Sequence, residues 1–254
     1  MVATDRGEAR QVPILALDEI DSTNAEARRR AEAGETGPLW ITAQRQTAGR
    51  GRRGRIWESG PGGNLAATLL TTTDQPLAQA AQISFIAALA VADLVRAYVT
   101  RDQAKVKWPN DVLVRGRKIA GVLIESGPAP GAGQWLATGI GVNLTHEPAA
   151  AERPATSFAL EGCDPPPAPD EALTALAARL QDWSDVWRDE GFAPIAKAWT
   201  DRAYGLGQAC RAHLGAQVID GVAEGIDLDG ALRLRLADGV VRRISAGDVF
   251  FGEA

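Results

Sequence analysis

The sequence has few of the residues that carry much of enzyme chemistry. Among its 254 residues are two histidines, His146 and His213, and two cysteines, Cys163 and Cys210. The cysteines lie far apart and lack the spacing of metal ligands, so the sequence suggests neither a disulfide framework nor a zinc motif. Two histidines also give little basis for a histidine-based triad. Any catalysis is expected to use other side chains.

Targeting and membrane signals are also missing. Residues 1–13 form a loose lead-in; the first dozen carry charges of both signs and no apolar core, unlike a signal peptide. No run of about 18 apolar residues is evident, so we expect no membrane-spanning helix. The net charge is −5, whereas general nucleic-acid binders are usually basic. We therefore expect a cytoplasmic protein with a small ligand.

One short segment concentrates positive charge. Residues 49–57, GRGRRGRIW, place four arginines and three glycines ahead of Trp57. Glycine lets a backbone approach a ligand closely, and guanidinium groups suit phosphate and carboxylate oxygens. A Walker-type phosphate loop is excluded, because G-x-x-x-x-G-K-[ST] does not occur. The segment predicts a cover for an anionic nucleotide, with a solvated basic loop and an RNA contact as alternatives.

The hydrophobic pattern predicts an α+β protein. Residues 14–35 read as a strand and a helix, with Thr23 to Glu26 as a capping box and Gly34 as the stop. A long, mostly buried helix is predicted over 77–99. Further strands are expected at 39–43, at 64–72 after a Pro61-Gly62-Gly63 turn, at 104–107, at 111–125 as a hairpin, and at 135–144. Hairpin connections favour a mixed or largely antiparallel sheet.

The pattern changes in the C-terminal part. A proline-rich connector precedes a helix that ends near Gly191, with Asp170 as its expected cap. From about Gly207, apolar and charged residues alternate between Asp-Gly turns at 229–230 and 238–239. A unit of this size predicts a small β-barrel packed on the main domain. We expect two domains, residues 1–206 and 207–254.

Four phrases together resemble the biotin protein ligases. They are DSTN at 21–24, QTAGRGRRGRIW at 46–57, KWPNDV at 107–112 with RKIAGVLIE at 117–125, and TGIGVNL at 138–144. Any one phrase is a weak signal, but their order and spacing make the match specific. The resemblance runs from about residue 14 to the C-terminus.

The resemblance implies a fold and a reaction. The fold would be a class II aminoacyl-tRNA synthetase-like domain with a mixed or antiparallel sheet, followed by an SH3-like β-barrel. The reaction would join biotin and ATP into biotinyl-5′-adenylate, with Mg²⁺ as the partner of the triphosphate. Biotin would then pass to a lysine of a biotin carboxyl carrier domain, such as that of acetyl-CoA carboxylase or a related carboxylase.

The resemblance also implies residue roles. Biotin would contact Ser22, Thr23, Asn24, Gln46, Arg50, Gly51, Arg52, Lys118, Gly121, Gly139 and Gly141. ATP would contact Arg52, Arg55, Trp57, Lys107, Asn110 and Asn143. Arg52, Lys107 and Lys118 would be the catalytic cations, and Trp57 would stack on adenine. The glycines would leave room beside the ligand, and Asp111 would help to place Mg²⁺.

Partners and rival functions follow from the same comparison. Only 20 residues precede Asp21, too few for the DNA-binding winged helix of some family members, so no DNA binding is expected. A homodimer is a further candidate assembly. One rival function is a lipoate or octanoate transferase or ligase of related fold. The other is a non-catalytic RNA-binding protein, whose affinity would fall steeply with salt.

Overall fold

The computed structural model describes residues 12–58, 60, 62–99, 103–131, 133–148 and 154–252. Residues 1–11 of the expected lead-in and Pro61 of the expected turn lie outside the described residues. The elements are β1 (Ile14–Ile20), α1 (Thr23–Glu32), β2 (Leu39–Gln46), η1 (Arg52–Gly54), β3 (Leu65–Thr73), α2 (Leu77–Ala80), α3 (Ile83–Tyr98), β4 (Ala104–Lys107), β5 (Asp111–Val114), β6 (Arg117–Pro128), β7 (Gln134–Val142), α4 (Pro169–Glu190), α5 (Phe192–Asp201), β8 (Ala209–Leu214), β9 (Gln217–Ile226), β10 (Leu232–Arg235), β11 (Val241–Ile244) and β12 (Asp248–Phe251).

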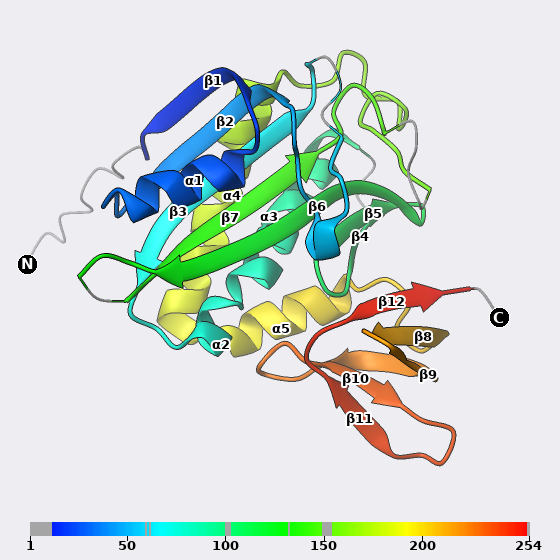
Figure 1. Ribbon diagram of the computed structural model, residues 1–254. Coiled ribbons are helices and arrows are strands. Elements are labelled where there is room, and N and C mark those ends of the chain that lie inside the picture. The colour runs from blue at the N-terminus through cyan, green and yellow to red at the C-terminus, as the bar shows by residue number, and fades with distance from the viewer. Residues whose placement is uncertain are drawn as a thin grey trace, which may run out of the picture.

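The larger of two sheets has seven strands in the order β1-β2-β3-β7-β6-β5-β4. Strands β1 and β2 run parallel, and the other neighbours are antiparallel. Helix α1 lies on one face of this sheet, while α3, with α4 behind it, covers the other (Figure 1). The expectation of an α+β protein with a mixed sheet is confirmed.

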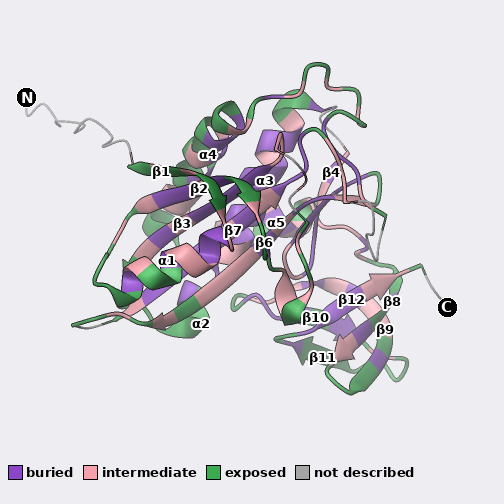
Figure 2. Cartoon of the chain, turned by 45° about the horizontal axis from the view of Figure 1, so that its top comes forward, coloured by how far each residue is buried: buried purple, intermediate pink, exposed green. Residues whose placement is uncertain are grey.

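Helix α3 forms the centre of the core. Most of its residues are buried, so it is apolar on nearly every side and appears largely purple in Figure 2. The segment Leu77–Tyr98 therefore has the length and the mean hydropathy, 1.6, of a membrane span, and 67% of that window is buried inside the fold. Gln79, Gln82 and Asp93 interrupt the segment, so it is not a continuous apolar run of about 18 residues. The core helix of a globular protein can have the same length and mean hydropathy, so this segment is weak evidence for a membrane span.

Four local expectations need correction. Ser22, rather than Thr23, is the N-cap of α1, so the predicted capping box does not form. The helix predicted over 77–99 is divided into α2 and α3. Helix α4 begins at Pro169 with Ala168 as its N-cap, because proline suits the first helical position; Asp170 is therefore not the cap. Helix α5 follows Gly191 and was not foreseen.

The smaller sheet is antiparallel, with the order β11-β10-β9-β8-β12. It packs against the part of the chain that carries the larger sheet: Nε1 of Trp108 donates to the carbonyl of Gly230 at 3.1 Å. Its buried residues, such as Ala212 and Val249, belong to the same hydrophobic cluster as Trp199. The two sheets therefore share one core.

Candidate active site

A cavity of about 530 Å³ lies between α1, the arginine-rich segment, the α1-side face of the large sheet and the first residue of β12. The structure brings every predicted site residue to its lining. These are Ser22, Thr23, Asn24, Gln46, Arg50, Gly51, Arg52, Arg55, Trp57, Lys107, Asn110, Asp111, Lys118, Gly121, Gly139, Gly141 and Asn143. Residues from most of the chain length thus converge on one site.

The turn between β1 and α1 is fixed by Asp21. Its carboxylate accepts the N–H of Ser22 at 2.7 Å and both terminal nitrogens of Arg29 at 2.8 and 2.9 Å. The hydrogen bonds from Arg29 are the main reason that the pKa of Asp21 falls to about 2. Within the described part of the chain, the Ser22 side chain makes no capping bond to α1. Ser22 is buried and lines the cavity.

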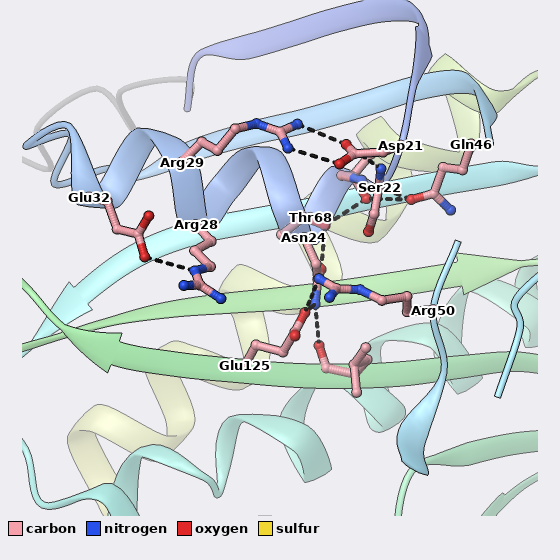
Figure 3. A network of polar contacts seen from close by, with 12 residues as sticks. Asp21, Ser22, Asn24, Arg28, Arg29, Glu32, Gln46, Arg50, Thr68 and Glu125 are labelled. Carbon is pink, nitrogen blue, oxygen red and sulfur yellow. Dashed lines mark hydrogen bonds and ion pairs between the residues drawn. The ribbon is translucent and has the colours of Figure 1, made fainter. Parts of the chain in front are cut away.

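At the end of the cavity beside α1, polar side chains from α1, β2, β3 and β6 contact one another (Figure 3). Thr23 donates its backbone N–H to Oε1 of Gln46 at 2.9 Å. The hydroxyl of Thr68 on β3 lies 2.8 Å from that of Thr23 and 2.7 Å from Oδ1 of Asn24. Nδ2 of Asn24 donates to Glu125 at 2.8 Å. Thr23, Asn24, Gln46 and Thr68 are uncharged, which suits recognition of a neutral polar group, and Glu125 is the one charged member of this set.

The glycines in the sheet make room for side chains of the protein itself. A Cβ at Gly139 would lie 2.2 Å from Oδ1 of Asn24, and one at Gly141 would lie 2.3 Å from the indole of Trp57. Trp57 also reaches Gly121, where a Cβ would be 3.3 Å from the ring. The role expected for these glycines was space beside the ligand. In the structure that space seats Asn24 and Trp57, two predicted ligand contacts.

One of the predicted catalytic lysines pairs with a carboxylate, and the other lies opposite the same residue in the sheet. Nζ of Lys118 lies 2.5 Å from Oδ1 of Asp111, and Lys107 is the cross-strand neighbour of Asp111 in the β4–β5 ladder. Nζ of Lys118 also lies 5.4 Å from the centre of a Trp57 ring. The cation is therefore held between an acid and an aromatic face.

Both amide side chains predicted to contact ATP also bond to the backbone. Nδ2 of Asn143 donates to the carbonyl of Thr156 at 3.0 Å, and Nδ2 of Asn110 donates to the carbonyl of Val122. An amide nitrogen carries two hydrogens, so each retains one for a ligand. These bonds fix where the two carboxamides stand.

Three arginines of the arginine-rich segment converge on Asp248 at the start of β12. Asp248 lies 3.4 Å from Arg52, 3.3 Å from Arg53 and 3.0 Å from Arg55. Arg52 also donates to the carbonyl of Gly247 at 3.0 Å. Burial raises the pKa of the Asp248 carboxyl, but the three guanidinium groups outweigh it and hold the pKa below its ordinary value. Burial likewise lowers the pKa of Arg52.

Sequence reasoning missed Asp248 as a cavity residue. It comes from the C-terminal sheet, outside the four recognised phrases, and no local pattern marks it. The sequence patterns also gave no role to Glu125, although that residue lies within the phrase at 117–125. Its contacts with Asn24 and with Arg50, whose Nη2 is 3.4 Å away, depend on the pairing of distant elements.

The sequence matches two described protein families. Residues 17–143 match the Biotin/lipoate A/B protein ligase family, and residues 205–252 match the biotin protein ligase C-terminal domain. A biotin--[acetyl-CoA-carboxylase] ligase of Paracoccus denitrificans is 44% identical over 93% of this chain and 99% of its own length. One of Mycobacterium tuberculosis is 33% identical over 94% and 88%.

Solved structures agree in fold. A biotin protein ligase of Aquifex aeolicus, in complex with biotin and ATP, superposes with a TM-score of 0.79 at 24% identity, over 94% of this chain and 99% of that chain. A biotin protein ligase of Leishmania major in complex with biotinyl-5-AMP gives a TM-score of 0.64 at 27% identity, over 92% and 99%. This chain belongs to the biotin protein ligase family.

Proposed function

We propose that the protein is an ATP-dependent ligase that forms biotinyl-5′-adenylate and transfers biotin to a lysine of a biotin carboxyl carrier domain. In the first step, a biotin carboxylate oxygen attacks the α-phosphorus of ATP and pyrophosphate leaves. In the second, the carrier lysine loses a proton, its nitrogen attacks the acyl carbon, and AMP leaves. The observation that carries the proposal is that the uncharged polar end and the cationic end belong to one cavity.

The cationic end suits the first step. Biotin carboxylate and triphosphate repel each other, so the chemistry needs positioning and charge neutralisation more than an acid or base. Arg52, Arg55, Lys107 and Lys118 all line this cavity and would gather the anions. The uncharged end, with Ser22, Thr23, Asn24 and Gln46, would hold the ureido ring, and Trp57 would stack on adenine.

Magnesium belongs to the proposal as the partner of the triphosphate. Among the described residues, no group of three or more His, Cys, Asp or Glu side chains is placed to hold a metal ion. Asp111 is one of three carboxylates that line the cavity, with Glu58 and Asp248, and Mg²⁺ commonly binds through one or two carboxylates together with phosphates. Asp111 fits that mode of binding, in which the metal neutralises phosphate charge.

The finer structural expectations are also part of the proposal. They are the relation of the seven-stranded domain to class II aminoacyl-tRNA synthetases, an SH3-like barrel for the small sheet, and domains at 1–206 and 207–254. A cytoplasmic location, where ATP is available, is part of the same proposal. A homodimer is tested by sedimentation of the purified protein.

The test is a panel of biotin, lipoate and octanoate, each with ATP and Mg²⁺. A ligand that binds the folded state raises the melting temperature, so biotin with ATP should raise it most. A carrier domain is then added to each mixture. Only the mixture that contains biotin should yield a covalent adduct, on one lysine of the carrier. Stabilisation and transfer with lipoate or octanoate would instead assign the related transferase or ligase activity.

A further inference from the structure

Glu125 on β6 begins a chain of side-chain contacts that runs through Asn24 and Thr68 (Figure 3) and ends at Thr23. Oε2 of Glu125 accepts from Nδ2 of Asn24 at 2.8 Å, and the carbonyl of Leu123 accepts from the same nitrogen at 3.3 Å. Oδ1 of Asn24 contacts the hydroxyl of Thr68 at 2.7 Å, and that hydroxyl contacts Thr23 at 2.8 Å. Thr23 and Asn24 line the cavity.

Glu125 fixes which way the amide of Asn24 faces. A carboxylate and a carbonyl only accept hydrogen bonds, so the amide nitrogen must face them and Oδ1 must face Thr68. Asn24 is buried, and a buried acceptor needs a donor. Thr68 has one hydroxyl hydrogen, and it therefore goes to Asn24.

The hydrogen of the Thr23 hydroxyl is also used within the protein. That hydroxyl donates to Oε1 of Gln46 at 3.1 Å, and the same amide oxygen accepts the Thr23 backbone N–H at 2.9 Å. The hydroxyl of Thr68 lies 2.8 Å from that of Thr23. The Thr23 oxygen thus offers lone pairs, rather than a hydrogen, to the cavity.

We propose that Glu125 is a positioning residue that makes this end of the cavity accept hydrogen bonds, and so selects a ligand that presents N–H groups there. The inference rests on the proposed function, in which the urea ring of biotin lies at this end. Glu125 acts through Asn24 and Thr68 and does not itself touch the ligand. Without an acceptor at residue 125, the carbonyl of Leu123 alone would orient Asn24, at a longer distance.

The test compares two variants of nearly equal size. Glu125→Met removes the acceptor, whereas Glu125→Gln keeps an oxygen that can serve both Asn24 and Arg50. We expect Glu125→Met to raise KM for biotin roughly tenfold, the effect of losing one well-formed hydrogen bond. Glu125→Gln should stay within about threefold of the parent. KM for ATP and the maximal rate at saturating biotin should change by less than about twofold in both, because the effect is confined to biotin binding.

Two controls separate this role from others. Glu32→Met removes an exposed glutamate of α1 that pairs with Arg28 at 2.7 Å, and it should leave KM for biotin unchanged. In an Asn24→Ala background, Glu125→Met should add nothing further, because the two residues act as one unit. Melting temperatures of all variants report folding.

The outcomes are distinguishable. A parent that forms no adenylate from biotin overturns the proposed function and this inference with it. An active parent with unchanged KM for biotin in Glu125→Met overturns the inference alone. Equal impairment of Glu125→Gln and Glu125→Met, or a full effect of Glu125→Met in the Asn24→Ala background, assigns Glu125 to charge pairing with Arg50 and overturns it as well.

Discussion

Nη2 of Arg55 lies 3.0 Å from Oδ2 of Asp248, and this contact joins the arginine-rich segment to the C-terminal sheet. Arg52 and Arg53 contact the same carboxylate, so one buried acid pairs with three cations beside the cavity. The C-terminal sheet therefore supplies part of the cavity wall through Asp248.

Asp248→Asn should loosen the arginine-rich segment. Trypsin cleaves after arginine in mobile chains, so we predict severalfold faster cleavage after Arg52, Arg53 or Arg55 in the variant, with no ligand present. Asp220→Asn, an exposed acid of the same sheet that pairs with Arg211 at 2.9 Å, is the matched control. Equal cleavage rates in Asp248→Asn and the parent would show that the carboxylate does not hold the segment.

The same carboxylate predicts a pH dependence of stability. The folded-state pKa of Asp248 lies below the ordinary value of 3.8, so its contribution is fully present above that value and is lost as the pH falls through the folded pKa. At pH 7, Asp248→Asn should lower the melting temperature by roughly 2–6 °C. The difference from the parent should shrink below about pH 3.8; a difference that grows on acidification contradicts the assignment.

The sequence predicted which residues meet at one cavity better than it predicted the turns and helix ends. The motif residues line that cavity, Ser22 and Asn143 among them, because four ordered phrases fix an architecture. The predicted capping box does not form, because Thr23 lies inside the helix and its hydroxyl contacts Gln46 and Thr68. A local sequence pattern does not contain these distant contacts. Asp248 and Glu125 escaped for the same reason: their partners come from other elements of the folded chain.

Deletion of residues 208–254 would test the C-terminal sheet poorly. Ala212 and Val249 share a hydrophobic cluster with Trp199, and removal of the sheet would expose that core. We predict that the truncated protein unfolds or aggregates, as measured by circular dichroism and sedimentation. A soluble, folded truncation that biotinylates a carrier at the parent rate would show that neither the packing nor Asp248 is needed.

Lys118→Ala should slow adenylate formation by roughly 10²-fold, the usual cost of losing a charge that stabilises a transition state. Single-turnover formation of adenylate and the melting temperature are measured side by side. The melting temperature should change little, since Lys118 is partly exposed and surface ion pairs contribute weakly. Lys105→Ala, on strand β4 of the same sheet, controls for loss of a lysine. A rate equal to that of the parent would end the proposal for Lys118.

Arg52→Gly should release the adenylate faster. The side chain of Arg52 lines the cavity and is anchored to Gly247 at 3.0 Å, so it can hold the segment over a reactive mixed anhydride and keep it from water. Charge-assisted hydrogen bonds contribute roughly 1.5–3 kcal/mol each, which corresponds to at least about tenfold in the release rate. Given biotin and ATP, the variant should label the lysines of serum albumin.

The matched control for that change is Arg53→Gly. Arg53 lies in the same segment and contacts the same Asp248, but the described lining of the cavity does not include it. The Arg53 guanidinium also donates to the carbonyl of His213 at 3.2 Å. Loss of Arg53 should therefore loosen the segment but leave the contact between Arg52 and the adenylate in place. We therefore expect bystander labelling from Arg52→Gly and near-parental labelling from Arg53→Gly. If both variants label albumin equally, general loosening of the segment, rather than a contact of Arg52 with the adenylate, controls release.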